Sequence, residues 1–166
     1  LSGYTAKVAG TELGVTEPKA TFSACFGQAF LALHPTEYAH ILGKKMAQHG
    51  SQAYLVNTGW SGGKYGAGQR MSLKITRKII DDILAGTIEK AACEILPVFQ
   101  LSIPKSLPGI PAGILNPREA WTDKADYDAT LCKLGEMFIK NFETFTDTDE
   151  GKALVAAGPN IVSMNN

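Results

Sequence analysis

The order of apolar and polar residues in the middle of the chain predicts a strand, a loop, a second strand and a helix. Residues 53–56 (AYLV) are apolar without interruption, which is typical of a buried strand. From Arg70, apolar residues fall on alternate positions, so residues 70–75 are predicted to be a second strand. From Thr76 the apolar spacing becomes helical, and Gly86 is expected to end the helix.

The flanking parts of the chain carry further periodic patterns. A helix is predicted to begin at His34, with a proline in its first turn, and to end at Gly50. Alternating apolar residues over 95–103 predict one half-buried strand. The longest helical pattern covers residues 123–146, and Thr148 is placed to cap a final short helix.

Three segments lack a clear period. Residues 1–22 are predicted to form a loop, and the apolar stretch 22–33 a buried helix or compact turn. Prolines punctuate residues 104–117, which indicates an extended surface segment. No repeat or linker divides the chain, so the sequence predicts a single body of the α/β class.

The loop before Arg70 is rich in glycine, which lets a backbone approach a ligand closely. A loop between strands of an α/β sheet is a common place for a ligand crevice, with Arg70 and Thr76 at its mouth. A plain surface hairpin loop is an equally good interpretation. The glycines concerned are Gly59, Gly62, Gly63, Gly66 and Gly68.

The chemistry of this region stays open on residue types alone. It is not a Walker phosphate loop, because Thr58 and Tyr65 stand where that motif needs a glycine and a Mg²⁺-binding hydroxyl. Arg70 suits stacking on a nucleotide base, or is a solvated charge at a strand end. Thr76 suits a hydrogen bond to a ligand, or merely caps the helix. The two tryptophans, Trp60 and Trp121, are expected to be packing residues.

Composition narrows the class of protein. The chain has 166 residues, enough for one domain with a core, and a net charge of +0, which argues against binding nucleic acid or an anionic membrane. No apolar run approaches the roughly 18 residues that span a bilayer. The three cysteines and three histidines have no metal-binding spacing, so reduced thiols in a reducing compartment are expected. A start at Leu1 suggests a piece of a larger protein.

Several long stretches of the sequence resemble a known protein family. In collinear order over nearly the whole length, it closely resembles the C-terminal part of the ATP-dependent phosphoenolpyruvate carboxykinases. The stretches concerned are SGYTAKVAGTELGVTEP, TFSACFGQAFLALHPTEYA, QAYLVNTGWSGG, RMSLKITRKIIDDILAG, ILNPREAW and ALVAAGP.

The resemblance implies a fold and a reaction. The fold would be the C-terminal part of the carboxykinase nucleotide-binding domain, a mixed sheet with flanking helices. The reaction would convert oxaloacetate and ATP to phosphoenolpyruvate, CO₂ and ADP in gluconeogenesis, with Mg²⁺ and Mn²⁺ neutralising charge. A cytoplasmic enzyme is expected, with no nucleic-acid or membrane partner.

The resemblance also assigns residues. Arg70 would lie against the nucleotide, Met71 would present backbone to the base, and Thr76 would offer a hydroxyl or amide contact. Residues 1–22 resemble the active-site lid, which excludes water before chemistry begins, and 23–166 would be the α/β body. The lid residues expected to matter are Lys7, Gly10, Thr11, Glu12, Gly14, Thr16 and Glu17.

No catalytic or metal-binding residue is expected in this chain. The phosphate loop, metal site and oxaloacetate-binding arginines would belong to sequence that precedes Leu1, so the missing N-terminal part of the same enzyme is the expected partner. The chain alone is expected to be inactive. Two alternatives are an isolated nucleotide-binding module and a catalytically idle structural fragment.

Overall fold

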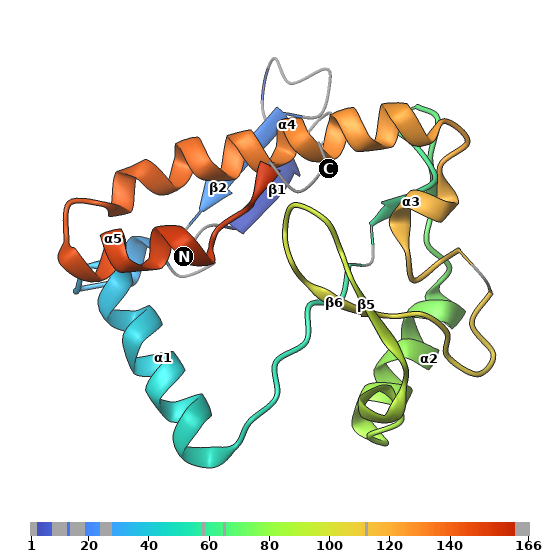
Figure 1. Ribbon diagram of the computed structural model, residues 1–166, viewed down its shortest axis with the longest axis horizontal. Coiled ribbons are helices and arrows are strands. Elements are labelled where there is room, and N and C mark those ends of the chain that lie inside the picture. Colours follow the sequence, from blue (N-terminus) through green and yellow to red (C-terminus); the bar gives the residue numbers. More distant parts are fainter. Residues whose placement is uncertain are drawn as a thin grey trace. The chain divides into compact units, whose positions relative to one another are not determined.

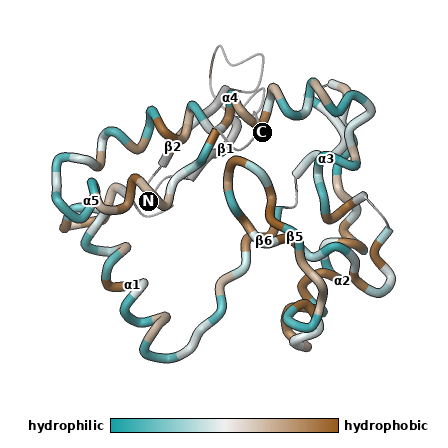
Figure 2. The backbone as a smooth tube through the Cα atoms, in the orientation of Figure 1, coloured by the Kyte–Doolittle hydropathy of each residue, from teal (hydrophilic) through white to brown (hydrophobic). Residues whose placement is uncertain are grey.

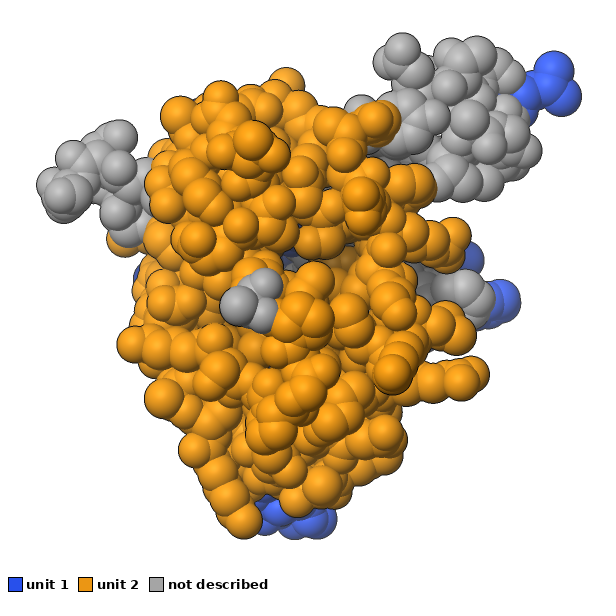
Figure 3. All heavy atoms as spheres, turned by 90° about the vertical axis from the view of Figure 1, so that its right-hand side faces the viewer, with its two compact units in different colours: residues 1–55, 136–158 blue, residues 56–135, 159–166 orange. Residues whose placement is uncertain are grey.

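The computed structural model describes residues 3–7, 13, 19–23, 28–57, 59–64, 66–111 and 113–161 (Figure 1). These residues group into two compact units (Figure 3). Unit 1 comprises residues 1–55 and 136–158, and unit 2 comprises residues 56–135 and 159–166.

Unit 1 begins with two strands where we predicted a loop. Strand β1 (Gly3–Lys7) pairs antiparallel with β2 (Lys19–Ser23), with Gly3 opposite Ser23 and Lys7 opposite Lys19. The loop prediction for residues 1–22 is therefore wrong at both ends, because pairing across the segment supplies the hydrogen bonds that periodicity could not reveal.

The stretch 22–33 differs in part from the prediction of a buried helix or turn. A short 3₁₀ turn, η1 (Gln28–Phe30), is present, but the Phe30 side chain is 91% exposed. Phe22 packs edge-on against Phe138, with ring centroids 5.2 Å apart. Residues 24–27 lie outside the described part of the chain.

Helix α1 (Pro35–His49) follows the prediction at both ends. His34 is its N-cap, and Gly50 ends it in the left-handed conformation at φ 62°. The Nδ1 atom of His34 accepts the Thr36 N–H at 3.4 Å, while Nε2 lies 3.3 Å from the Asp147 carboxylate. The imidazole also contacts the ring of Phe145 edge-on. One side chain therefore joins the start of α1 to the C-terminal part of unit 1.

The C-terminal helices also agree with the sequence pattern. Helix α4 spans Lys124–Phe142, and the unit boundary falls within it, after Gly135. A 3₁₀ turn η3 (Glu143–Phe145), helix α5 (Asp149–Leu154) and a second turn η4 (Val155–Ala157) follow. Thr148 caps α5 as predicted, because its hydroxyl accepts the Gly151 N–H at 3.1 Å.

Two strand predictions fail, one at residues 53–56, where the first segment of unit 1 ends, and one at residues 70–75 of unit 2. Residues 51–57 have no regular secondary structure, and Leu55 is 85% exposed, so the buried strand at 53–56 is wrong. A strand needs a neighbour to accept its hydrogen bonds, and no described strand pairs with this run. The predicted strand at 70–75 is also wrong beyond Arg70, because helix α2 (Leu73–Leu84) begins there with Ser72 as its cap.

The remaining elements of unit 2 are short. Strand β3 (Trp60–Ser61) pairs with β4 (Gln69–Arg70), and α2 ends before Gly86, which has φ 67°. A 3₁₀ turn η2 (Ile88–Lys90) leads into the next strands. After the described parts of the proline-rich segment, α3 (Pro117–Ala120) is capped by Asn116.

The strand predicted over 95–103 is instead a hairpin. Strands β5 (Cys93–Ile95) and β6 (Ser102–Pro104) pair antiparallel, and the chain reverses between them. Val98 and Gln100 have positive φ angles of 67° and 54° in this turn. The Leu96 N–H donates to the Leu101 carbonyl at 2.8 Å, which closes the loop. Alternation was the wrong guide here because the turn itself is apolar (Figure 2).

This turn supplies the centre of the unit 2 core. Val98 is 0% exposed and packs in one cluster with Tyr127 and Leu131 of α4. Gly135 belongs to the same helix, and a Cβ there would lie 2.7 Å from Val98 Cγ1. The helix therefore needs a glycine at this point to admit the hairpin turn.

The α/β class is confirmed. The arrangement of its strands differs from the mixed sheet that we expected, because the described strands form three separate two-stranded antiparallel sheets. A mixed sheet requires parallel neighbours with long crossovers, and each described pair instead joins strands that are consecutive along the chain.

Two glycines inside helices should respond oppositely to alanine. Gly43→Ala in α1 meets no atom within 4 Å and should raise the free energy of unfolding by about 0.5–1 kcal/mol. Gly135→Ala gains the same helix propensity, but overpacking against Val98 costs about 1–3 kcal/mol, so a net loss is expected. Urea unfolding followed by circular dichroism measures both; equal gains would refute the packing account.

Candidate functional site

The predicted nucleotide contacts lie on the β3–β4 hairpin and the start of α2. Arg70 is exposed on β4 and lies directly opposite Trp60 of β3. Residues that face each other in an antiparallel pair project from the same side of the sheet. Trp60 is 60% exposed, so the prediction that it is a packing residue is wrong, whereas Trp121 packs on the unit 2 core as predicted.

Backbone bonds fix how the two other predicted contacts are presented. The Met71 N–H donates to the Gly59 carbonyl at 3.0 Å, which leaves its carbonyl oxygen as the backbone group for a ligand. Thr76 is half-buried in the first turn of α2, and its hydroxyl donates to the Ser72 carbonyl at 3.2 Å. Thr76 therefore does not cap α2, which leaves only its oxygen lone pairs for another partner.

The glycine-rich loop is closely packed on itself. A Cβ at Gly68 would lie 2.9 Å from the Gly63 carbonyl oxygen and 3.0 Å from that of Ser61, so only glycine fits. Lys64, at the tip, forms an ion pair with Asp126 at the start of α4. Its ammonium group is thus engaged by a carboxylate, which agrees with the mismatch to a Walker loop.

The predicted lid residues fall largely outside the described part of the chain. Lys7 is the last residue of β1. Gly10, Thr11, Glu12, Gly14, Thr16 and Glu17 lie outside the described residues, and their role stays a prediction.

The described residues hold neither a metal-binding cluster nor a membrane-spanning helix. Within the described ranges, no three His, Cys, Asp or Glu side chains come together as a metal-binding group. In the same part of the chain, no helix has the length and apolar content needed to cross a bilayer.

Comparison with known proteins identifies the family. The family model for phosphoenolpyruvate carboxykinase matches residues 1–113. The chain belongs to the phosphoenolpyruvate carboxykinase family. It is 61% identical over 145 residues to phosphoenolpyruvate carboxykinase (ATP) of Leptospira biflexa, covering 87% of this chain and 27% of that protein. It is 55% identical over 161 residues to the Campylobacter lari enzyme of the same name, covering 97% of this chain and 31% of that protein.

The matches differ in how much of this chain and of each relative they cover. The chain spans about 30% of the length of the curated relatives that it matches, at 31% and 27%. The family model ends before α3 and α4, whereas the Campylobacter lari carboxykinase matches nearly the whole chain.

Unit 2 also contains a cavity that the sequence did not predict. Its volume is about 360 Å³, and it lies between the β5–β6 hairpin, α3 and the first turns of α4. It is lined by Glu94, Ile95, Leu96, Pro97, Ile103, Asn116, Arg118, Glu119, Tyr127, Asp128 and Leu131. Arg70, Met71 and Thr76 do not line it.

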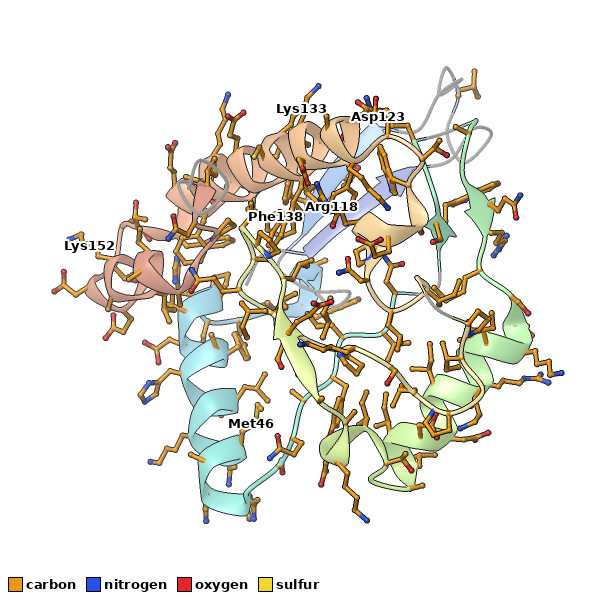
Figure 4. The ribbon with its side chains drawn as sticks, turned by 45° about the vertical axis from the view of Figure 1, so that its right-hand side comes forward. Met46, Arg118, Asp123, Lys133, Phe138 and Lys152 are labelled. Atoms are coloured by element: carbon orange, nitrogen blue, oxygen red, sulfur yellow. The ribbon has the colours of Figure 1, made fainter. Side chains whose placement is uncertain are left out.

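The polar side of the cavity is built around the ion pair of Arg118, labelled in Figure 4, with Asp128. Arg118 donates to both carboxylate oxygens of Asp128, from Nε at 2.8 Å and from Nη2 at 2.9 Å. This hydrogen bonding holds the pKa of Asp128 below its ordinary value and raises that of Arg118. Burial, followed by the charge of Asp128, raises the pKa of Tyr127.

The Arg118–Asp128 pair should make stability depend on pH. Because the pKa of Asp128 is lower in the folded than in the unfolded chain, its contribution is present above the unfolded value of about 3.9 and is lost as pH falls through the folded value. Asp128→Asn should therefore lower the urea midpoint at pH 7 and have a smaller effect near pH 3. An equal effect at both pH values would contradict the ion-pair account.

Proposed function

We propose that this chain supplies the base side of the ATP site of a phosphoenolpyruvate carboxykinase, which converts oxaloacetate and ATP to phosphoenolpyruvate, CO₂ and ADP. One observation carries the proposal: the β3–β4 hairpin sets Arg70 opposite an exposed aromatic ring, two residues before the cap of α2. Both relatives bear the name phosphoenolpyruvate carboxykinase (ATP), which supports the reaction.

Each residue has a distinct part in this proposal. The guanidinium of Arg70 is exposed and planar, so it suits stacking on the nucleotide. The Met71 carbonyl accepts a hydrogen bond from the base, since its N–H is already bonded to Gly59. The Thr76 oxygen accepts a further bond, since its proton is directed to Ser72. All three contacts recognise the base and ribose side of ATP.

The chemical step needs groups from elsewhere. Bound Mg²⁺ and Mn²⁺ supply charge neutralisation in phosphoryl transfer, and the described residues bring no metal-binding trio together. The phosphate loop, the metal ligands and the oxaloacetate-binding groups are therefore assigned to the polypeptide that the relatives have outside the matched region, which makes that polypeptide the partner. This chain alone is expected to be inactive.

The segment 1–22 is proposed as the lid. Closure would exclude water, which otherwise protonates the enolate formed by decarboxylation. The pairing of β1 with β2 supports a defined base for this segment, because Lys7 and Lys19 are held opposite each other. The reducing cytoplasm is the proposed location, in keeping with free thiols at Cys93 and Cys132.

An exposed apolar stripe on α2 supports packing of this chain against the part of the carboxykinase that lies outside the matched region. Leu73, Ile80 and Leu84 recur at helical spacing on one face and are 66%, 42% and 81% exposed. Large aliphatic side chains gathered on one helix face are typical of an interface. The stripe begins three residues after Arg70, so covering it and completing the nucleotide site would involve the same surface.

The alternatives are an isolated nucleotide-binding module and an idle fragment. Titration calorimetry of the chain with ATP separates them, because a module binds ATP with an affinity near that of a whole carboxykinase, whereas an idle fragment gives no heat of binding.

Arg70→Ala tests the nucleotide contact in a complete enzyme. In a chimera that joins this chain to the unmatched remainder of the Leptospira biflexa relative, the substitution should raise the KM for ATP about 10–100-fold, as expected for losing a charged contact. The KM for oxaloacetate should stay unchanged. Lys74→Ala, which removes an exposed cation of α2 outside the apolar stripe, is the control. An unchanged KM for ATP would refute the proposed role.

Leu84→Ser tests the apolar stripe. In the chain alone the stability should change by less than about 0.5 kcal/mol, because the side chain is 81% exposed. In the chimera the loss should reach about 2–3 kcal/mol if further polypeptide buries the leucine. Thermal unfolding measures both, and Lys74→Ser is the polar control on the same helix. Similar small losses in both contexts would mean that the stripe stays uncovered.

A further inference from the structure

The cavity between the β5–β6 hairpin, α3 and α4 has one carboxylate, Glu94, with no ion-pair partner among the described residues. The charge of Asp128 is paired with Arg118, and Glu119 receives a hydrogen bond from Lys124 at 3.4 Å. Glu94 has only a neutral partner among the described residues, the Asn116 amide, which donates to its Oε1 at 2.8 Å. The Glu94 carboxylate can therefore form an ion pair with a cationic ligand in the cavity.

A second polar group in the cavity wall, the Tyr127 hydroxyl, has no hydrogen-bond partner among the described residues. Tyr127 is 7% exposed and lines the cavity, yet its hydroxyl makes no hydrogen bond with any residue that the structure describes. The oxygen is not among the sealed, unsatisfied atoms of the described residues, so it opens onto accessible space. Because this oxygen is accessible and has no partner among the described residues, its lone pairs are available to an incoming N–H donor.

The rest of the wall is apolar. Its members are Ile95, Leu96, Pro97, Ile103 and Leu131. A volume of about 360 Å³ lies within the range that small-molecule sites occupy. A matching ligand has a short apolar body and a cationic head with several N–H donors. An anion fits poorly, because three carboxylates line the cavity against one guanidinium.

We propose that this cavity binds a primary ammonium group on a short aliphatic stem. The Glu94 carboxylate and the Tyr127 hydroxyl oxygen accept its N–H donors, and the apolar wall packs against the stem. The same chemistry is offered by a free alkylamine and by a lysine side chain of a polypeptide.

Nuclear magnetic resonance titration of the ¹⁵N-labelled 166-residue chain tests the proposal. The probes are n-butylammonium, uncharged n-butanol and anionic butyrate, which share the same four-carbon stem. Butylammonium should give saturable shifts in the amides that line the cavity and bind about tenfold more tightly than butanol, because only it forms charged hydrogen bonds. Binding of butyrate as tight as that of butylammonium, or shifts scattered outside the cavity, would overturn the proposal.

Variants locate the two acceptors. Glu94→Gln should weaken butylammonium binding about tenfold and leave butanol unaffected, and Tyr127→Phe should weaken butylammonium about threefold. Glu136→Gln is the control, because Glu136 is an exposed carboxylate of α4, the helix of Tyr127, and does not line the cavity. It should leave butylammonium binding unchanged. If Glu94→Gln loses its dispersed spectrum, Tyr127→Phe decides. Unchanged affinity in the variant that decides overturns the proposal.

The two sources of the ammonium group are separated by one further probe. Nα-acetyl-lysine methylamide carries the same head on a peptide backbone. Tighter binding than butylammonium assigns the cavity to a lysine of a polypeptide, and equal or weaker binding assigns it to a free amine. Both results support the site, whereas no cavity shifts with either amine would refute it.

Discussion

The packing of Val98 over Gly135 is the constraint on which unit 2 depends. Val98 is fully buried with φ 67°, a conformation that costs a β-branched residue about 1–3 kcal/mol. Surrounding contacts hold it there: its side chain packs with Tyr127 and Leu131, and its carbonyl accepts the Asn160 N–H at 2.7 Å. The turn that carries Val98 also sets β5 and β6, so the same contact positions the cavity wall at Glu94 to Pro97.

Elements defined by local signals were predictable from the sequence. The start of α1 at His34, its end at Gly50, the end of α2 before Gly86 and the cap of α5 at Thr148 all follow from side chains within a few residues of the helix end. Elements defined by pairing were not. The β1–β2 and β5–β6 strands depend on partners across a turn, and no described strand pairs with the apolar run at 53–56.

The two candidate sites differ in what the sequence could say. The resemblance named Arg70 and Thr76, whereas residue types alone left both with ordinary structural roles. That Trp60 lies opposite Arg70 required the strand register. The cavity was missed because its key pairs, Glu94 with Asn116 and Arg118 with Asp128, bring together different elements. The only signal in the sequence was the ILNPREAW stretch, which supplies Asn116 and Arg118.

The ring of His34 has a consequence for which residues this position can accept. Nδ1 lies 3.4 Å from the Thr36 nitrogen and 2.7 Å from the Thr36 hydroxyl oxygen, while Nε2 lies 3.3 Å from the Asp147 carboxylate. Asparagine or aspartate would satisfy the helix end but is too short to bridge to the aspartate as well, and lysine reaches the aspartate without accepting anything. An imidazole offers two opposed ring nitrogens on a rigid frame. His34 therefore contacts the first turn of α1 and Asp147 at the same time, although these segments are distant in sequence.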